Sequence, residues 1–159
     1  MICLKNTLKN RDLICVIMIL ENEIEDVRGK IIFYLQDDRH VSMIEMKKGY
    51  SRGGHYHPQM QDHIIISGKL EYREEDINTK QEEIRIIEEP TVIKVPANKA
   101  HLFIAIEDTI FVESFVGKYQ ATNYLKYRKD VEDRIKNNSI ILPTEVGYTH
   151  ILLIRKEFV

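Results

Sequence analysis

Short alternations of apolar and polar residues fill the chain from about residue 13 to residue 116. In the segment KLEYREE (69–75), Leu70 and Tyr72 alternate with Glu71 and Arg73, the period of two typical of a strand with one buried face. Similar segments are bounded by Gly, Pro, Asn or Asp, which favour turns. They cover residues 13–20, 31–35, 41–47, 64–66, 83–87, 91–95, 100–106 and 109–116. This spacing predicts roughly nine or ten short strands.

The beginning of the chain combines an apolar run with a polar one. The run LICVIMIL (13–20) is too short to cross a membrane and predicts a strand covered on both faces. The following ENEIEDVRGK (21–30) is predicted to be a polar connection. Cys3 and Cys15 lack metal-ligand spacing, and so favour a reduced, cytoplasmic protein.

The period changes at residue 122, where an amphipathic helix is predicted over Thr122–Asn137. Its apolar positions follow steps of three and four residues: Tyr124, Tyr127, Val131 and Ile135. Thr122 or Asn123 would be the N-cap. After a loop framed by Pro143 and Gly147, a final strand is predicted over Thr149–Phe158.

Many short strands with turn signals predict an all-β fold, an antiparallel double-sheet jelly roll or barrel. The 159 residues fit a single domain, 1–159. The composition is that of a soluble globular protein, with 43% hydrophobic and 30% charged residues and a net charge of -2. Because no stretch is strongly basic, nucleic acid is excluded as a main partner.

Candidate chemistry concentrates in GYSRGGHYHPQMQDHIIISG (49–68), where His55 and His57 stand two residues apart. Residues two apart in a strand point to the same face, so both imidazoles project together. This spacing suits either a metal ion or a pair of proton-transfer groups. Gly53-Gly54 and Ser67-Gly68 are predicted to be turns that bound the strands.

Two segments of the chain resemble the two sequence motifs of the cupin superfamily, over residues 26–117. The first motif falls on Gly49, His55, His57, Gln61 and Gly68, and the second on Pro96, Asn98, His101 and Ala105. Gln61 replaces the family's usual glutamate, Asn98 replaces a glycine, and Ala105 an asparagine. Because Asn tolerates a positive φ, Asn98 is expected to make the same turn. The resemblance implies a double-stranded β-helix. The C-terminal helix and strand (118–159), predicted from their periodicity, are not part of the family pattern.

One hypothesis is a metal-dependent cupin, such as a dioxygenase or small-molecule isomerase. His55, His57, Gln61 and His101 would then bind a divalent metal (Fe, Ni, Mn or Zn). Imidazole suits these transition metals, and an amide oxygen is a weaker ligand.

The other hypothesis, preferred on the sequence, needs no cofactor. Asp26-x-Arg28-Gly29 and Arg52-Gly53-x-His55-x-His57 resemble the nucleotide-sugar branch, the dTDP-4-keto-6-deoxyglucose 3,5-epimerases and 3,4-ketoisomerases. The resemblance implies that His55 and His57 act as acid and base on a keto sugar, while Arg52 and Arg28 hold the diphosphate. The protein would then serve polysaccharide biosynthesis.

Proton abstraction beside a ketone needs a donor for the developing oxyanion. Tyr50, Tyr72 and His63 are the candidates, and Asp62 or Glu113 could orient a histidine base. The sequence does not choose among them.

Two further expectations remain open. A third hypothesis is a cupin that binds a ligand but has no catalytic activity, because a fold does not determine a function. A homodimer is expected because the apolar N-terminal strand and the two-faced strand 109–116 need cover. His40 and His150 lie outside the pattern and are predicted to be surface or interface residues.

Overall fold

The computed structural model describes residues 18–88 and 90–139. Several sequence predictions fall outside these residues: the final strand Thr149–Phe158, the loop at Pro143 and Gly147, His150, both cysteines, and residues 13–17 of the first predicted strand.

Within the described residues the chain forms eleven strands and one helix. The strands are β1 (Ile19–Asp26), β2 (Gly29–Gln36), β3 (Arg39–Met46), β4 (Ser51–Tyr56), β5 (Gln61–Ser67), β6 (Leu70–Asp76), β7 (Glu82–Ile87), β8 (Thr91–Val95), β9 (Lys99–Ala105), β10 (Thr109–Val116) and β11 (Thr122–Asn123), and the helix is α1 (Leu125–Ser139). The predicted all-β architecture with one late helix is confirmed.

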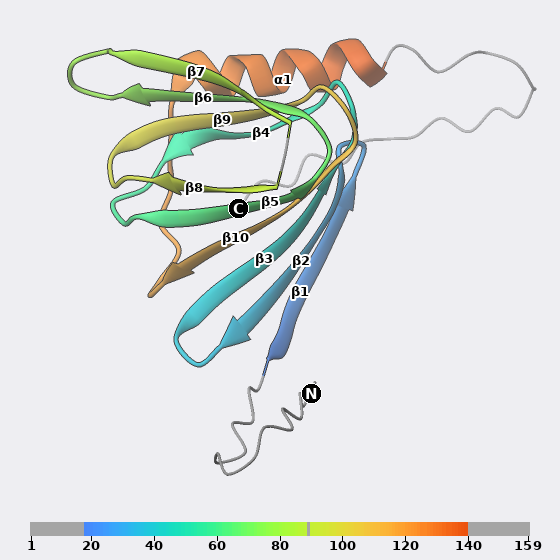
Figure 1. The fold of residues 1–159 in the computed structure, drawn as a ribbon, viewed down its shortest axis with the longest axis vertical. Helices are drawn as coiled ribbons and strands as arrows, with labels where there is room; N and C mark the ends of the chain where they lie inside the picture. The colour runs from blue at the N-terminus through green and yellow to red at the C-terminus, as the bar shows by residue number, and fades with distance from the viewer. Residues whose placement is uncertain (1–17, 89, 140–159) are drawn as a thin grey trace, which may run out of the picture.

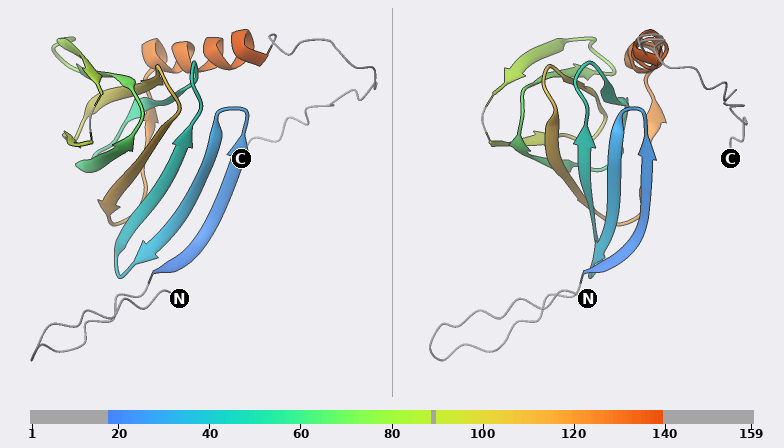
Figure 2. Two further views of the ribbon diagram at one scale, coloured as in Figure 1. Left: turned by 45° about the vertical axis from the view of Figure 1, so that its right-hand side comes forward. Right: turned by 90° about the vertical axis from the view of Figure 1, so that its right-hand side faces the viewer.

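The strands build two antiparallel sheets that face each other (Figure 1). One has six strands in the order β1-β2-β3-β10-β5-β8, and the other has five in the order β11-β4-β9-β6-β7. Figure 2 shows β1, β2 and β3 side by side as a curved extension of the barrel, away from β6 and β7.

The core lies between the sheets because each strand turns alternate side chains inward. Phe103 of β9 and Phe111 of β10 stack with ring centroids 5.2 Å apart, and Ile65, Met46 and Tyr72 pack in the same buried cluster. A cavity adjoins this core and is lined by Phe103 and Phe111 together with residues of β1, β2 and β3.

Helix α1 covers the outer face of the five-stranded sheet, against β4 and β9 (Figure 1). Tyr127 and Val131 are buried against Leu102 and Ile104 of β9, as the helical spacing predicts. The predicted start at Thr122 is wrong, because Thr122 and Asn123 pair with β4 as the short strand β11. The edge of β4 thus takes up the two residues expected to cap the helix.

Three other local predictions are corrected. Most of the polar segment 21–30 belongs to β1 and pairs with β2 along its length, because its glutamates alternate with Asn22 and Ile24. Gly53-Gly54 is no turn: both residues lie inside β4, where the register with β9 shifts between Gly53 and His55. The segment 64–66 is not buried throughout, since Ile64 and Ile66 face outward.

Two predicted turns are confirmed by their backbone angles. Asn98 has φ of 62° between β8 and β9, and Gly68 has φ of 92° after β5. A Cβ atom on Gly68 would lie 2.2 Å from the carbonyl oxygen of Asp108, so this turn admits only glycine. No helix among the described residues is long and apolar enough to cross a membrane.

Candidate functional site

Three histidines meet inside the barrel, two from the paired strands β4 and β9 and one directly after the end of β4. His55 of β4 lies opposite His101 of β9 in the strand register, and His57 follows two residues later. Their ring centroids are 4.6 Å (55–57), 4.9 Å (55–101) and 5.3 Å (57–101) apart. One ring nitrogen from each lies within 4.8 Å of the other two. We call His55, His57 and His101 the histidine cluster.

The bulge in β4 gives this cluster its position. Arg52 and His55 are three residues apart, so in a regular strand they would point to opposite faces. The register shift after Gly53 inserts one extra residue, as β-bulges do. Arg52 and His55 therefore both line the same cavity.

Hydrogen bonding fixes the tautomer of His57. Its Nδ1 lies 2.6 Å from the carbonyl oxygen of Gln120, which can only accept, so Nδ1 donates. The Nε2 atom then carries a lone pair, and it is buried without a hydrogen-bond partner. A backbone carbonyl holding one nitrogen while the other stays free is the arrangement typical of metal-bound histidines.

Burial keeps the cluster uncharged at neutral pH. Desolvation and the neighbouring His57 lower the pKa of His55 to about 4. The pKa of His57 is lowered mainly by burial. The pKa of His101 is lowered well below its ordinary value by burial and by the other cluster members. Neutral imidazoles are the form that binds metals.

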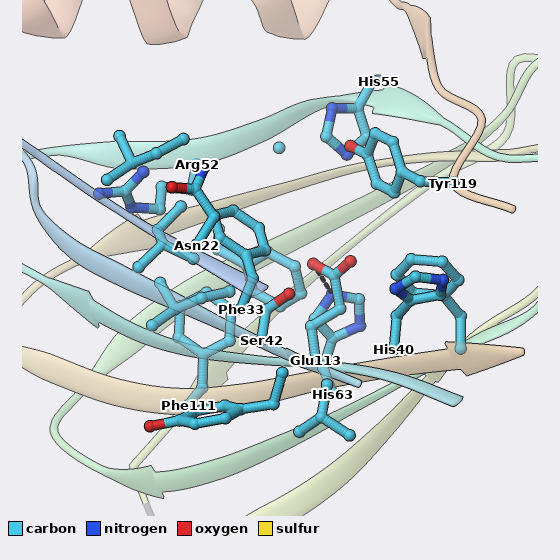
Figure 3. Close-up of a pocket in the computed structure, with 18 of the residues that line it drawn as sticks. Asn22, Phe33, His40, Ser42, Arg52, His55, His63, Phe111, Glu113 and Tyr119 are labelled. Atoms are coloured by element: carbon cyan, nitrogen blue, oxygen red, sulfur yellow. Dashed lines mark ion pairs between the residues drawn. The ribbon is translucent and has the colours of Figure 1, made fainter. Parts of the chain in front are cut away.

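Gln61 and His63 stand next to each other along the inner face of β5, close to Glu113 of β10. Gln61 donates from Nε2 to Glu113 Oε1 at 3.2 Å, which leaves its buried Oε1 without a partner. His63 Nε2 lies 3.4 Å from Glu113 Oε2 (Figure 3). Burial would raise the pKa of Glu113, but the contact with His63 outweighs it and holds that pKa below its ordinary value.

Two arginines lie at a second polar region of the cavity. Arg28 makes a bidentate contact with Asp26, with Nη2 2.6 Å from Oδ2. Arg52 donates to the carbonyl oxygen of Gly29 at 3.1 Å, and its buried Nε has no partner. Burial and the nearby Arg28 lower the pKa of Arg52 to about 10, which still leaves it charged at pH 7.

A cavity of about 660 Å³ is lined by His55 and His101 of the cluster, by His63 and Glu113, and by both arginines. It lies between the two sheets and is walled by apolar side chains, among them Phe33, Ile44 and Phe111. Figure 3 shows Arg52 and His55 apart on β4, with the His63–Glu113 pair on the neighbouring wall. An apolar cavity with a few convergent polar groups is typical of small-molecule sites.

Among the candidates named from the sequence, the cavity is lined by His55, His63, His101, Arg52, Arg28 and Glu113, whereas His57 and Gln61 are not in its lining. His40, which the sequence placed outside the site, also lines the cavity. The structure does not bring Tyr72 or Tyr50 to the cavity wall. Tyr72 is fully buried in the core and donates its hydroxyl hydrogen to Glu74 at 2.6 Å. Asp62 lies on the outer side of β5, away from His63, by the alternation of that strand.

Sequence reasoning missed the segment that follows β10. Tyr119 lines the cavity, with its ring centroid 5.2 Å from that of His57, and burial raises the pKa of its phenol to about 12. Gln120 contributes only its backbone carbonyl. Because neither residue belongs to a periodic pattern or motif, no signal in the sequence pointed to them.

The donor set of the site fits a divalent transition metal. The observation is the buried, unpartnered Nε2 of His57, in a place where two more imidazoles converge. The Oε1 of Gln61 is likewise buried and without a partner, and so is available as a fourth donor. Three neutral nitrogens and one amide oxygen suit ions such as Fe, Ni or Zn, and Mn less well.

Comparison with known proteins supports the fold. No family model and no curated protein sequence matches this chain. It is similar to the capsular polysaccharide assembling protein CapF from Staphylococcus aureus, with a TM-score of 0.54 and 18% identity, over 65% of this chain and 31% of that one. It is also similar to Bacillus subtilis oxalate decarboxylase, in a structure concerned with Mn(II) centres, with a TM-score of 0.59 and 18% identity, over 80% and 38%.

This chain therefore spans about a third of the length of those proteins. At 18% identity the likeness shows the fold alone, which is the cupin jelly roll predicted from the sequence.

Proposed function

We propose that this protein is a metal-dependent cupin enzyme acting on a small anionic substrate, with proton transfer as its chemistry. The observation that carries the proposal is the buried, unpartnered Nε2 of His57 among three converging imidazoles. An unsatisfied buried polar atom costs about 1–3 kcal/mol, and a bound ion removes that cost.

His55, His57 and His101 would hold the ion through ring nitrogens, and Gln61 through Oε1. When bound, a divalent ion supplies Lewis acidity, which polarises a substrate oxygen or acidifies a bound water. With no carboxylate in the ligand set, the charge of the ion is not offset by its ligands, which favours that role.

His63 and Glu113 supply the proton transfer. Both His63 ring nitrogens are buried and lack hydrogen bonds, so one can take a proton from a substrate carbon or hydroxyl in the cavity. The ionised Glu113, 3.4 Å away, stabilises the imidazolium that forms. Tyr119 carries a phenol that stays protonated at neutral pH and can return a proton.

Arg52 orients the substrate. It is 7% exposed, and its Nε is buried without a partner in the wall of the cavity. A carboxylate or phosphate can accept from this guanidinium in the bidentate manner that arginine favours. The three residues from Arg52 to His55 span roughly 10 Å of strand, which sets the distance between the anionic group and the reacting end.

The first test is elemental analysis of the purified protein, before and after chelation. We expect a stoichiometric divalent metal, its loss in His101→Ala, and its retention in His40→Ala, which removes a histidine outside the cluster. Metal below one ion per ten chains, after incubation with Fe, Ni, Mn and Zn salts, would remove this proposal.

A second candidate is the isomerisation or epimerisation of a nucleotide-linked 4-keto-6-deoxy sugar without a metal. It is favoured by the presence of Arg28, Arg52 and the His63–Glu113 pair in one cavity. His55 and His57 would then transfer protons to and from the sugar, and Arg28 and Arg52 would bind its diphosphate. The similarity to CapF, described as a capsular polysaccharide assembling protein, suits such a substrate.

Deuterium exchange separates the two candidates. Chelated protein is incubated with dTDP-4-keto-6-deoxyglucose in heavy water, and the C3 and C5 positions are monitored. Exchange by the metal-free protein supports the second candidate. Exchange only after metal is restored supports the first, and sugar binding without exchange supports a ligand-binding cupin.

A further inference from the structure

The outward face of the six-stranded sheet carries apolar residues where a solvated sheet carries polar ones. One registered row crosses five neighbouring strands. Its members pair in sequence as Ile32 with Met43, Met43 with Val112, Val112 with Ile64, and Ile64 with Val92. We call these five residues the apolar row.

Several adjacent apolar side chains in and beside the row are exposed together, unlike the isolated apolar residues found on most protein surfaces. Met43, Ile64 and Val92 are 40%, 43% and 57% exposed, and Ile110 and Ile66 lie beside the row, 36% and 46% exposed. An antiparallel sheet with one solvated face normally has polar residues there. A contiguous apolar patch on a sheet therefore indicates an interaction surface.

On the outer face of the five-stranded sheet, a helix covers the apolar residues of β9. Leu102 and Ile104 are buried beneath Tyr127 and Val131 of α1. Where the helix does not reach, β6 turns Glu71 and Arg73 outward, and the exposed Ile84 and Ile86 of β7 lie directly beside these charges. Among the described residues, no helix lies over the apolar row (Figures 1 and 2).

We propose that the apolar row is the interface of a homodimer, so that its occupant is a second copy of this chain. Val112 of β10 is the middle member, with two apolar neighbours on each side. A two-fold axis through Val112 brings the row onto itself, which is the self-complementarity that an isologous interface requires.

The charges beside the row also fit a second copy. Asp62 and Lys94 form a cross-strand pair of opposite sign at one side, and Glu45 pairs with Ile110 at the other. This mixed and slightly acidic surface does not suit nucleic acid or an anionic membrane, which need concentrated positive charge.

The area of the outward face is of the order that a small dimer interface buries. Six strands at about 4.8 Å spacing give a width of roughly 24 Å, and strands of this length run for roughly 20 Å. The resulting area of about 500 Å², before the relief of side chains is added, approaches the ~800 Å² that a standard interface buries on each partner.

Sedimentation velocity of the full chain tests the interface. We expect a dimer for the natural sequence and a monomer for Ile64→Lys with Val92→Lys, because two unpaired lysines would weaken association by about 100-fold or more. The control is Ile84→Lys on β7, a residue 53% exposed on the other sheet, which should stay dimeric. Circular dichroism confirms that each variant is folded.

A cysteine placed on the two-fold axis gives an independent measurement. In a Cys3→Ser, Cys15→Ser background, Val112→Cys should form a covalent dimer under mild oxidation, because Val112 meets the same residue of the second copy. Ile84→Cys should not. A monomeric natural protein, a dimer that survives both lysines, or equal cross-linking of the two cysteine variants would each overturn the proposal.

Discussion

Most of the buried side-chain polar atoms without partners in the described part of the molecule belong to four residues of the candidate site. Nitrogens of Arg52, His57 and His63 and the Oε1 of Gln61 are all buried and unpaired, and outside this group only Ser51 Oγ and Asp62 Oδ1 among the described residues share that state. Most buried polar groups in proteins are hydrogen-bonded. A cluster of exceptions therefore indicates that a ligand completes the site.

At the residue scale, Glu113 should control metal affinity although it is not a ligand. It accepts from Nε2 of Gln61 and thereby leaves Oε1 free. In Glu113→Ala we expect affinity to fall by about 10–100-fold, the usual effect of losing a group that orients a ligand. Glu113→Gln keeps an acceptor and should lose less, and Glu71→Ala on the outer surface should lose nothing, as measured by competition with a chelating dye.

The metal-free protein should become less stable as the pH falls from 6.5 towards 4. The folded pKa of His55 is about 4, below the unfolded value of about 6.5. At pH values between 4 and 6.5, His55 binds a proton in the unfolded chain but not in the folded chain, and this difference lowers the free energy of unfolding. The loss for His55 is about 1–2 kcal/mol between pH 7 and pH 5.

Urea unfolding at the two pH values measures this loss. His55→Asn should show a smaller loss than the natural sequence. An equal loss in both proteins would mean that His55 titrates normally in the folded state.

The histidines and Arg52 could be found from the sequence because their spacing is short and local. His55 and His57 share a face by strand alternation alone, and His101 falls on a second motif. Tyr119 and Gln120 could not be found, because their positions depend on the path of a connection between β10 and β11. For Tyr72 the strand was predicted correctly, but its position in the core and not in the cavity wall depends on tertiary packing.

At the scale of elements, the bulge in β4 is the feature on which the site depends. It places Arg52 and His55 on one face of the sheet. Gly53 has φ of 94°, and a Cβ atom there would lie 2.8 Å from the carbonyl oxygen of His101. The Gly-Gly pair was predicted to be a turn because both a turn and a bulge need positive φ. Only the observed pairing of β4 with β9 shows that this Gly-Gly pair forms a bulge and not a turn.

Gly53→Ala should therefore destabilise the protein and weaken metal binding together. The matched control is Gly117→Ala, where φ is 86° but no atom lies within 4 Å of the added Cβ. The control should cost about 1–2 kcal/mol for the backbone conformation alone. Gly53→Ala should cost about 1–3 kcal/mol more for the close contact, as measured by thermal unfolding. Equal costs would mean that β4 and β9 move apart without penalty.

At the scale of the whole molecule, the two sheets serve different ends. The five-stranded sheet supplies the histidine cluster and is covered by α1. The six-stranded sheet supplies Gln61, His63 and Glu113 on its inner face, and the apolar row on its outer face. The strand order of each sheet depends on long-range pairing, such as β3 with β10, which local periodicity does not specify. The strand pattern predicted an antiparallel jelly roll or barrel, and the resemblance in the motifs narrowed this to the double-stranded β-helix of the cupins.

Calorimetric titration of the chelated protein with Zn, Ni, Fe and Mn salts measures whether the histidine cluster binds a metal ion. We expect one ion per chain for at least one metal, and a rise in the free energy of unfolding of about 2.7 kcal/mol when the free metal is 100 times its Kd. His57→Ala should lose both effects, while His40→Ala should keep both. If no metal binds stoichiometrically, or if His57→Ala binds as the natural sequence does, the histidine cluster is not a metal site.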